Sequence, residues 1–293
     1  MRISVVQQGN VDALVIWMAD RLFRLSSEWA LANGLPHSAE ALVALGRDGV
    51  RALAEWQPRL PQLPDAGDWV EPSDVVFLPP VPRGRKIVCV GLNYRKHVEE
   101  THLDAPSAPL LFSKFDNALT GHDAVVARPR QTTQLDYEAE IAVVMGRKAR
   151  DVPESDALDY VLGLTLANDL SARDVQFASS QWLLGKTYDG FCPIGPALVT
   201  LDECPDVHNI GLRCSVNGEL RQNASTAQMI FSFETLIHYV SSQFTLEPGD
   251  VILTGTPDGV VLGQPEEERH WLQPGDEVVV EAEGLGRLRT VIE

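Results

Sequence analysis

Two glutamates near the middle of the chain have the spacing to act together. Residues 136–144 read DYEAEIAVV, which places Glu138 and Glu140 two positions apart. In a strand, residues two apart share a face and lie about 6.6 Å apart along it. Two such carboxylates repel each other unless a cation neutralises them, and Mg²⁺ and Mn²⁺ prefer carboxylate oxygens. A solvated strand face is the alternative interpretation.

A third acid, Asp169, stands where another apolar run ends, a position typical of residues that face a pocket. Three carboxylates can form one side of an octahedral site, with water and substrate oxygens in the remaining positions. The zinc-type residues Cys204, His208 and Cys214 are too few and too loosely spaced, so we interpret them as loop residues. We therefore predict a Mg²⁺ or Mn²⁺ site formed by the three acids.

His97 and Glu100 form a second cluster, in the segment GLNYRKHVEE that begins at Gly91. If a helix begins there after a strand at residues 87–90, the two side chains are i,i+3 neighbours on one face. A carboxylate beside an imidazole fixes its tautomer and raises its basicity, as the deprotonation of a water requires. A structural or solvent-exposed histidine is the alternative.

Two further residues stand beside glycines. Lys186, next to Gly185, is a candidate for binding an anionic substrate or stabilising an oxyanion, although a surface lysine fits the same pattern. Thr256 lies in the turn LTGTPDG, which can offer N–H groups and a hydroxyl to a carboxylate or be an ordinary turn. The sequence has no GxSxG elbow, no Walker A loop and no GxGxxG after a strand, so serine-nucleophile and nucleotide chemistry are not indicated.

The composition disfavours several kinds of partner. The 293 residues include 24 Lys+Arg and 41 Asp+Glu, a formal net charge of −17, which disfavours nucleic acids and anionic membranes. No run approaches the roughly 18 apolar residues of a membrane span, and the first residues lack a signal-peptide pattern. Four cysteines without a CxxC pair indicate reduced thiols. We expect a cytoplasmic protein that binds neither nucleic acid nor membrane.

The elements that must position these residues fall into two regions, which we predict to be domains 1–80 and 81–293. The first has a proline-rich segment at its end, over 58–82, that we interpret as a linker. Its expected elements are strands at 3–6 and 14–17 and a helix over 38–56. The second region is strand-rich, and its expected elements are strands at 87–90, 135–145 and 160–170, a hairpin turn at Asn217-Gly218 and one long helix over 226–244.

A set of short segments in fixed order resembles the fumarylacetoacetate hydrolase family. In chain order they are GLNYRKHVEE, FSK, DYEAEIAVVMG, ANDLSARDVQ, GKTYDGFCPIGP, VNGELRQ and GTPDGV, and they run from about Lys86 to the C-terminus. The resemblance implies a mixed α/β, predominantly β fold. This fold is a mixed β-sandwich roll that carries a small N-terminal α/β domain and assembles as a homodimer.

The resemblance also implies roles for individual residues. The metal ligands for Mg²⁺ or Mn²⁺ would be Glu138, Glu140 and Asp169. The catalytic residues would be His97, Glu100 and Lys186. Substrate-side positions would be Asn93, Tyr94, Lys114, Gln176 and Thr256. One position departs from the pattern, because Leu92 stands where many acylpyruvate-cleaving relatives carry an arginine that contacts a substrate carboxylate.

Together, the residues and the resemblance predict a divalent-metal-dependent hydrolase. It would cleave a C–C bond of a small 2-oxo or β-diketo acid, of acylpyruvate or diketo-deoxy acid type, through an enolate that the metal stabilises. His97 and Glu100 would activate water, and residues 101–109 would form a lid. The same site would also suit an oxaloacetate-type decarboxylase or a 2-hydroxymuconate-type isomerase. The non-enzyme alternative is a scaffold that binds metal and oxo acid with little turnover.

Overall fold

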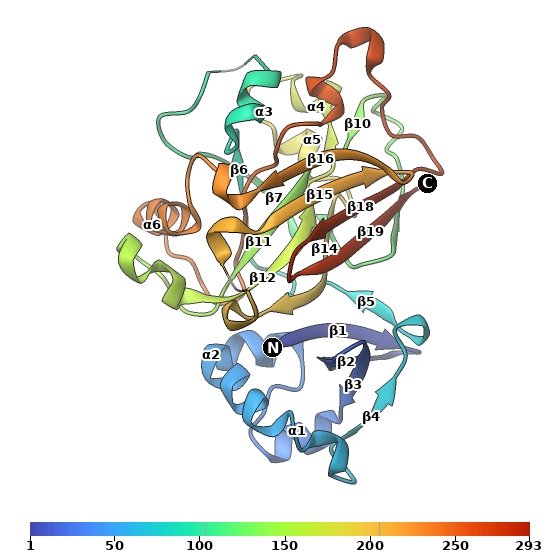
Figure 1. Ribbon diagram of the computed structural model, residues 1–293, viewed down its shortest axis with the longest axis vertical. Coiled ribbons are helices and arrows are strands. Elements are labelled where there is room, and N and C mark those ends of the chain that lie inside the picture. Colours follow the sequence, from blue (N-terminus) through green and yellow to red (C-terminus); the bar gives the residue numbers. More distant parts are fainter. Residues whose placement is uncertain (103, 205) are drawn as a thin grey trace.

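The computed structural model describes residues 1–102, 104–204 and 206–293. Figure 1 shows a smaller N-terminal region, coloured blue to cyan, below a larger region that holds most of the strands. Leu103, inside the predicted lid over 101–109, lies outside the described residues, so the lid stays a prediction. Among the described residues, no helix combines enough length with enough apolar character to cross a membrane.

The N-terminal region is a small α/β unit whose strands pair in the order β4-β3-β2-β1, with β5 also paired to β1. The strands expected at 3–6 and 14–17 are confirmed as parts of β1 and β2. The bounds are β1 (Arg2–Gln8), β2 (Val11–Met18), β3 (Arg21–Leu25), β4 (Gly67–Val70), β5 (Val76–Leu78), α1 (Ser27–Ala32) and α2 (Ala39–Trp56).

The expected helix over 38–56 is confirmed as α2, which begins after an N-cap at Ser38. The Ser38 hydroxyl accepts a hydrogen bond from the backbone N–H of Ala41, which satisfies one free donor of the first turn. The helix is kinked at Gly46, where φ is 56°. A Cβ at this position would lie 2.7 Å from the carbonyl oxygen of Gly146, so only glycine allows this close approach between the two regions.

The proline-rich segment is more than the linker that its composition suggested. It contributes β4, which pairs with β3, and β5, which pairs with β1. Pro72 begins a short 3-10 helix between these two strands. Prolines disrupt a strand only where they remove a ladder hydrogen bond, and here Pro72 lies outside the ladders.

The larger region supplies the remaining elements. Its strands are β6 (Ile87–Gly91), β7 (Leu110–Lys114), β8 (Leu119–Thr120), β9 (Ala124–Val126), β10 (Leu135–Asp136), β11 (Ala139–Met145), β12 (Val161–Asn168), β13 (Ser171–Ala172), β14 (Cys192–Val199), β15 (Gly211–Val216), β16 (Glu219–Ser225), β17 (Val251–Leu253), β18 (Glu277–Ala282) and β19 (Gly286–Ile292). Its α-helices are α3 (Arg95–Glu100), α4 (Arg173–Gln176), α5 (Leu183–Lys186) and α6 (Phe233–Gln243).

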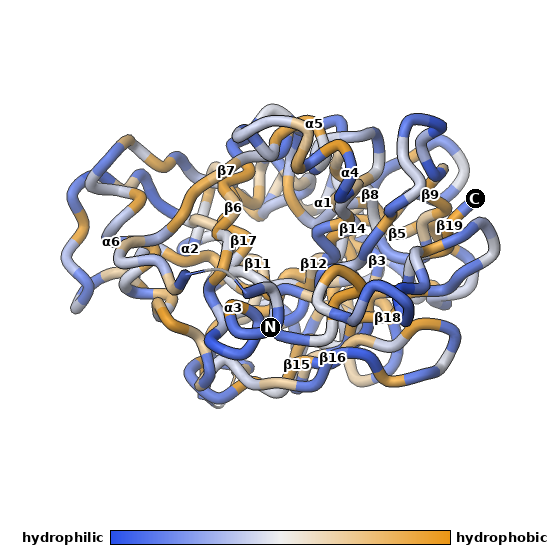
Figure 2. Tube along the Cα trace, turned by 90° about the horizontal axis from the view of Figure 1, so that it is seen from above, coloured by the Kyte–Doolittle hydropathy of each residue, from blue (hydrophilic) through white to orange (hydrophobic). Residues whose placement is uncertain are grey.

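Two sheets of this region pack against each other. The first runs β14-β12-β11-β17-β6-β7, and the second runs β16-β15-β18-β19-β9. Strands β12 and β14 contact β18 and β19 across the interface, and Figure 2 shows hydrophobic segments along β6 and β7. Because β1 pairs with β14, the N-terminal strands extend the first sheet. The fold is thus the predicted mixed α/β, predominantly β, sandwich roll, whereas the domain boundary near residue 80 stays a prediction.

The long helix expected over 226–244 is shorter than its apolar stripe indicated. Helix α6 begins only at Phe233, after an N-cap at Ser232. The backbone N–H of Ile230 instead donates to the carbonyl of Asn93 at 2.7 Å, and Met229 bridges to Tyr94. Residues 226–228 form a short 3-10 helix, and the residues directly after it are extended because they pair with the loop that leads into α3, a long-range contact that local periodicity does not report.

Candidate active site

The strand pairing brings the three predicted acids together. Glu140 lies in β11, Glu138 just before it, and Asp169 directly after the end of β12. Strands β11 and β12 are antiparallel neighbours, with Glu140 opposite Ala167. One carboxylate oxygen from each acid lies within 4.8 Å of the others, and all three residues are buried. The chain therefore converges three oxygen ligands on one point.

Buried cations surround two of these acids. The Lys186 Nζ lies 2.8 Å from Glu138 Oε2 and 2.9 Å from Asp169 Oδ2. Lys114 pairs with the other oxygen of Asp169, and Arg173 Nη1 lies 2.7 Å from Glu138 Oε1. Although burial alone would raise the pKa of Glu138, the Lys186 and Arg173 cations lower it to about 2.

Glu140 differs, because no cation pairs with it among the residues that the structure describes. Its Oε2 accepts one hydrogen bond, from the backbone N–H of Gly255 at 2.7 Å. Burial, and then the charges of Asp169 and Glu138, raise the pKa of Glu140 well above its ordinary value. An all-oxygen donor set with one uncompensated carboxylate fits a hard divalent cation such as Mg²⁺ or Mn²⁺.

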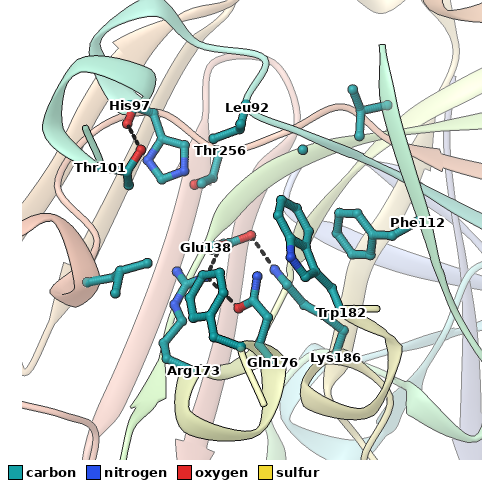
Figure 3. Close-up of a pocket in the computed structure, with 14 residues that line it drawn as sticks. Leu92, His97, Thr101, Phe112, Glu138, Arg173, Gln176, Trp182, Lys186 and Thr256 are labelled. Carbon is teal, nitrogen blue, oxygen red and sulfur yellow. Dashed lines mark hydrogen bonds and ion pairs between the residues drawn. The ribbon is translucent and has the colours of Figure 1, made fainter. Parts of the chain in front are cut away.

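The predicted His97–Glu100 pair forms on helix α3. The His97 Nδ1 lies 2.8 Å from Glu100 Oε1, and Glu100 Oε2 accepts a hydrogen bond from the backbone N–H of Gly259 at 2.9 Å. With Nδ1 engaged by the carboxylate, Nε2 of neutral His97 is the free proton acceptor. Figure 3 shows the His97 ring on the same side of the pocket as Thr256 and facing the space near Glu138.

A narrow pocket of about 30 Å³ joins these groups. Five of the predicted site residues line it, namely His97, Glu138, Gln176, Lys186 and Thr256. Its remaining wall is largely apolar and is formed by Val90, Gly91, Leu92, Phe112, Phe177, Trp182 and Leu262, together with Thr101 and Arg173. The Lys186 ammonium also lies 5.0 Å from the centre of the Phe112 ring, a distance at which a cation–π contact stabilises a buried cation.

The other predicted site residues lie behind the pocket wall. The Asn93 amide donates to the carbonyls of Phe231 and Thr254 and accepts from the Phe231 N–H. Both of its N–H donors are thus used in positioning the loop, and the predicted substrate contact of Asn93 stays a prediction. The hydroxyl of Tyr94 is buried with no partner among the described groups, and burial, followed by the charge of Glu140, raises its pKa.

Arg173 is a site residue that the sequence pattern did not single out. Its side chain is 2% exposed, it pairs with Asp136 at 2.9 Å as well as with Glu138, and its Nη2 has no partner among the described groups. The signal was present in the segment ANDLSARDVQ, where an arginine follows Asp169 by four positions. A charged residue in such an apolar, strand-rich context indicates a buried ion-pair network.

The chain is similar to known proteins over most of its length. Residues 86–293 match the family model described as fumarylacetoacetate (FAA) hydrolase C-terminal. The human protein named oxaloacetate tautomerase FAHD2A, mitochondrial, is 46% identical over 250 residues, which cover 84% of this chain and 74% of the human one.

Two solved structures share the whole fold. Fumarylacetoacetate hydrolase from Exiguobacterium antarcticum is 30% identical, with a TM-score of 0.81 over 100% of this chain and 99% of that one. Maleylpyruvate hydrolase from Sphingobium sp. SYK-6, solved in complex with manganese(II) and pyruvate, is 26% identical, with a TM-score of 0.79 over 100% of this chain and 98% of that one. The chain therefore belongs to the fumarylacetoacetate hydrolase family of enzymes.

Proposed function

We propose that this protein is a divalent-metal-dependent keto–enol tautomerase of a small 2-oxo dicarboxylic acid of the oxaloacetate type. The observation that carries the proposal is that Glu138 of the acid cluster and His97 of the His97–Glu100 pair line one narrow pocket. The 46% identity to a protein named oxaloacetate tautomerase supports this reaction over the hydrolysis predicted from sequence.

Glu138, Glu140 and Asp169 would hold the cation. When bound there, Mg²⁺ or Mn²⁺ would supply Lewis-acid polarisation of the 2-keto oxygen, which makes the neighbouring C–H more acidic. The Nε2 of His97 would move the proton at that carbon, because Nδ1 is committed to Glu100. Glu100 would stabilise the imidazolium that forms, and the backbone N–H of Gly259 keeps the Glu100 carboxylate in place.

Arg173 supports a dicarboxylic substrate. Its guanidinium lines the pocket and is held by Asp136 and Glu138, yet its Nη2 has no partner in the part of the chain that the structure describes. A buried donor without an acceptor is costly, and a carboxylate is the acceptor that a guanidinium binds best. The second carboxylate of the substrate would therefore complete the hydrogen bonds of Arg173, which a monocarboxylic 2-oxo acid cannot do.

Hydrolysis of an acylpyruvate remains a second candidate, because one observation favours it. A histidine whose Nδ1 is fixed by a carboxylate also suits the deprotonation of a water, and the maleylpyruvate hydrolase shares this fold. The two reactions differ in what they consume, since only hydrolysis breaks a C–C bond and takes up water.

The loss of the ultraviolet absorbance of enol-oxaloacetate, in the presence of Mg²⁺, tests the proposal. We expect the protein to accelerate ketonisation, excess chelator to abolish the acceleration, and His97→Asn to slow it by about a hundredfold. The exposed His270 lies outside the pocket lining, so His270→Asn should match the wild type. Cleavage of acetylpyruvate without any acceleration of ketonisation would instead establish the hydrolase.

A further inference from the structure

A second cavity, of about 380 Å³, lies between the N-terminal strands and the sandwich. The N-terminal region contributes Arg2, Trp17, Pro72 and Phe77. The sandwich and its connections contribute His122, Asp123, Pro196, Ala197, Leu285, Gly286, Arg287 and Arg289. None of these residues lines the pocket of the candidate active site, and the volume is in the range of sites for small organic ligands, about 300–1,000 Å³.

Arginines outnumber acids in the wall of this cavity, although the protein as a whole has a formal net charge of −17. Three arginines contribute to its wall against one acid, Asp123. Arg289 is already neutralised, because its Nη1 lies 3.2 Å from Asp123 and its Nε donates to Glu277. This leaves Arg2 and Arg287 as the arginines that matter for a ligand.

Arg2 and Arg287 have spare donors. Arg2 uses one nitrogen, Nη2, to donate to the carbonyl of Gly284 at 2.8 Å, and no carboxylate pairs with it within the described part of the chain. Arg287 reaches Glu277 and Glu281 only at 3.9 Å, beyond hydrogen-bond distance. A guanidinium with free donors at the wall of a cavity matches the planar geometry of a carboxylate.

The remaining wall suits a flat apolar group. The rings of Trp17 and Phe77 are stacked, with centroids 6.1 Å apart and planes at 12°, and His122 meets Phe77 edge-on at 5.4 Å. Trp17 keeps its own N–H satisfied, by donating to the Ser4 hydroxyl, so its ring needs no polar partner from a ligand. Flat aromatic walls bind planar apolar groups through stacking and burial of area.

We propose that this cavity is a binding site for a planar organic carboxylate, aromatic or conjugated, separate from the active site. Its carboxylate would lie against Arg2 and Arg287 and its flat body against Trp17 and Phe77. The site would exist only where residues of both regions meet, which gives the N-terminal region a part in ligand binding. The proposal does not depend on the reaction assigned to the active site.

Calorimetric titration of the full chain with 2-naphthoate tests the proposal. We expect binding with a Kd below about 1 mM, and binding at least about tenfold weaker for the uncharged 2-naphthalenemethanol. The double variant Arg2→Gln/Arg287→Gln should weaken 2-naphthoate by about tenfold or more. Arg213→Gln is the matched control, an exposed arginine in the same sheet as Arg287 but outside the cavity, and should bind like the wild type.

A competition experiment shows in which of the two cavities 2-naphthoate binds. Oxalate with Mg²⁺ occupies a 2-oxo acid site, and we expect saturating amounts of both to leave the affinity for 2-naphthoate unchanged within about twofold. Competition with oxalate would place the 2-naphthoate in the active pocket and overturn the proposal. Equal binding by the wild type and the double variant, or no binding of 2-naphthoate at all, would overturn it as well.

Discussion

The two regions of this molecule bury very different side chains. Within residues 1–80, all of which the structure describes, the only buried polar side chain is that of Ser4, and no charged side chain is buried. Around the candidate active site, by contrast, ion pairs join two buried acids to buried cations, and the buried side chains include three acids and three cations in all. These are Glu138, Glu140, Asp169, Lys114, Arg173 and Lys186.

This difference distinguishes side chains that are buried for stability from side chains that are buried for function. Apolar burial stabilises a fold at about 25 cal/mol per Å², which is how the N-terminal sheet holds together. Burying a charge costs several kcal/mol per ion, and ion pairing returns only part of that. A cluster that includes the uncompensated Glu140 is therefore hard to explain by stability, and we attribute it to the binding of a cation and an anionic substrate.

The largest expected effect comes from Asp169→Asn, which keeps the shape of the side chain and removes its charge. We expect turnover per folded molecule to fall by about a thousandfold, because the bound cation would lose the negative charge of one of its three proposed ligands. The matched control is Asp250→Asn. Asp250 is equally buried, but the residues that donate hydrogen bonds to it within the described ranges are Lys86 and Glu247, away from the site.

Asp250→Asn should lower the free energy of unfolding by about 1–3 kcal/mol and leave turnover within about twofold. Enzyme kinetics on both variants, with folding checked by circular dichroism, separates the two kinds of buried acid. If the two variants lost turnover equally, the contrast between a functional and a structural carboxylate would be wrong.

In the N-terminal region, a core truncation should affect stability alone. Leu14 is 1% exposed in β2, so Leu14→Ala leaves a cavity and should lower the free energy of unfolding by about 2–5 kcal/mol. Turnover per folded molecule should stay at the wild-type value, because no residue of β2 lines the catalytic pocket. Urea unfolding and kinetics at low temperature measure both quantities, and a large loss of turnover in molecules that remain folded would contradict the comparison.

The smallest expected effect concerns Glu140 and pH. Because its pKa is raised in the folded state, the metal-free folded protein holds this proton more tightly than the unfolded chain does. Its contribution to stability is therefore complete below the ordinary carboxyl pKa, about 4.3. It is lost as pH rises through the raised value. The Glu140→Gln variant has no ionisable group at this position, so it does not lose this part of its stability as pH rises.

We therefore expect metal-free Glu140→Gln to melt at or above the wild-type temperature at pH 7. At the same pH, Mg²⁺ should raise the Tm of the wild type and not that of the variant, since a ligand that binds only the folded state stabilises it. Thermal melts at pH 5 and pH 7, with and without Mg²⁺, test this. A variant that is less stable without metal and still responds to Mg²⁺ would mean that Glu140 is structural.

The parts of the site that sequence could predict are those set by local geometry. Glu138 and Glu140 alternate with apolar residues, and His97 and Glu100 are one helical turn apart, so period alone places each pair together. That Asp169 joins the glutamates depends on the pairing of β11 with β12, whereas the sequence indicated it through the place of Asp169 at the end of an apolar run and through the family resemblance.

What the sequence did not predict depends on contacts between distant segments. The role of Asn93 follows from its bonds to Phe231 and Thr254, more than 130 residues away. The unpartnered donor of Arg173 appears only once Asp136 and Glu138 have taken its other nitrogens. Likewise, β4 and β5 are strands because β3 and β1 are beside them, not because of their own composition.

The central claim, that three buried carboxylates hold one divalent cation, is tested most directly by electron paramagnetic resonance of Mn²⁺ titrated into the protein. The wild type and Asp250→Asn should each bind one Mn²⁺ per chain, and Asp169→Asn should leave the added Mn²⁺ free in solution. Undiminished Mn²⁺ binding by Asp169→Asn, or no binding by the wild type, would contradict the account.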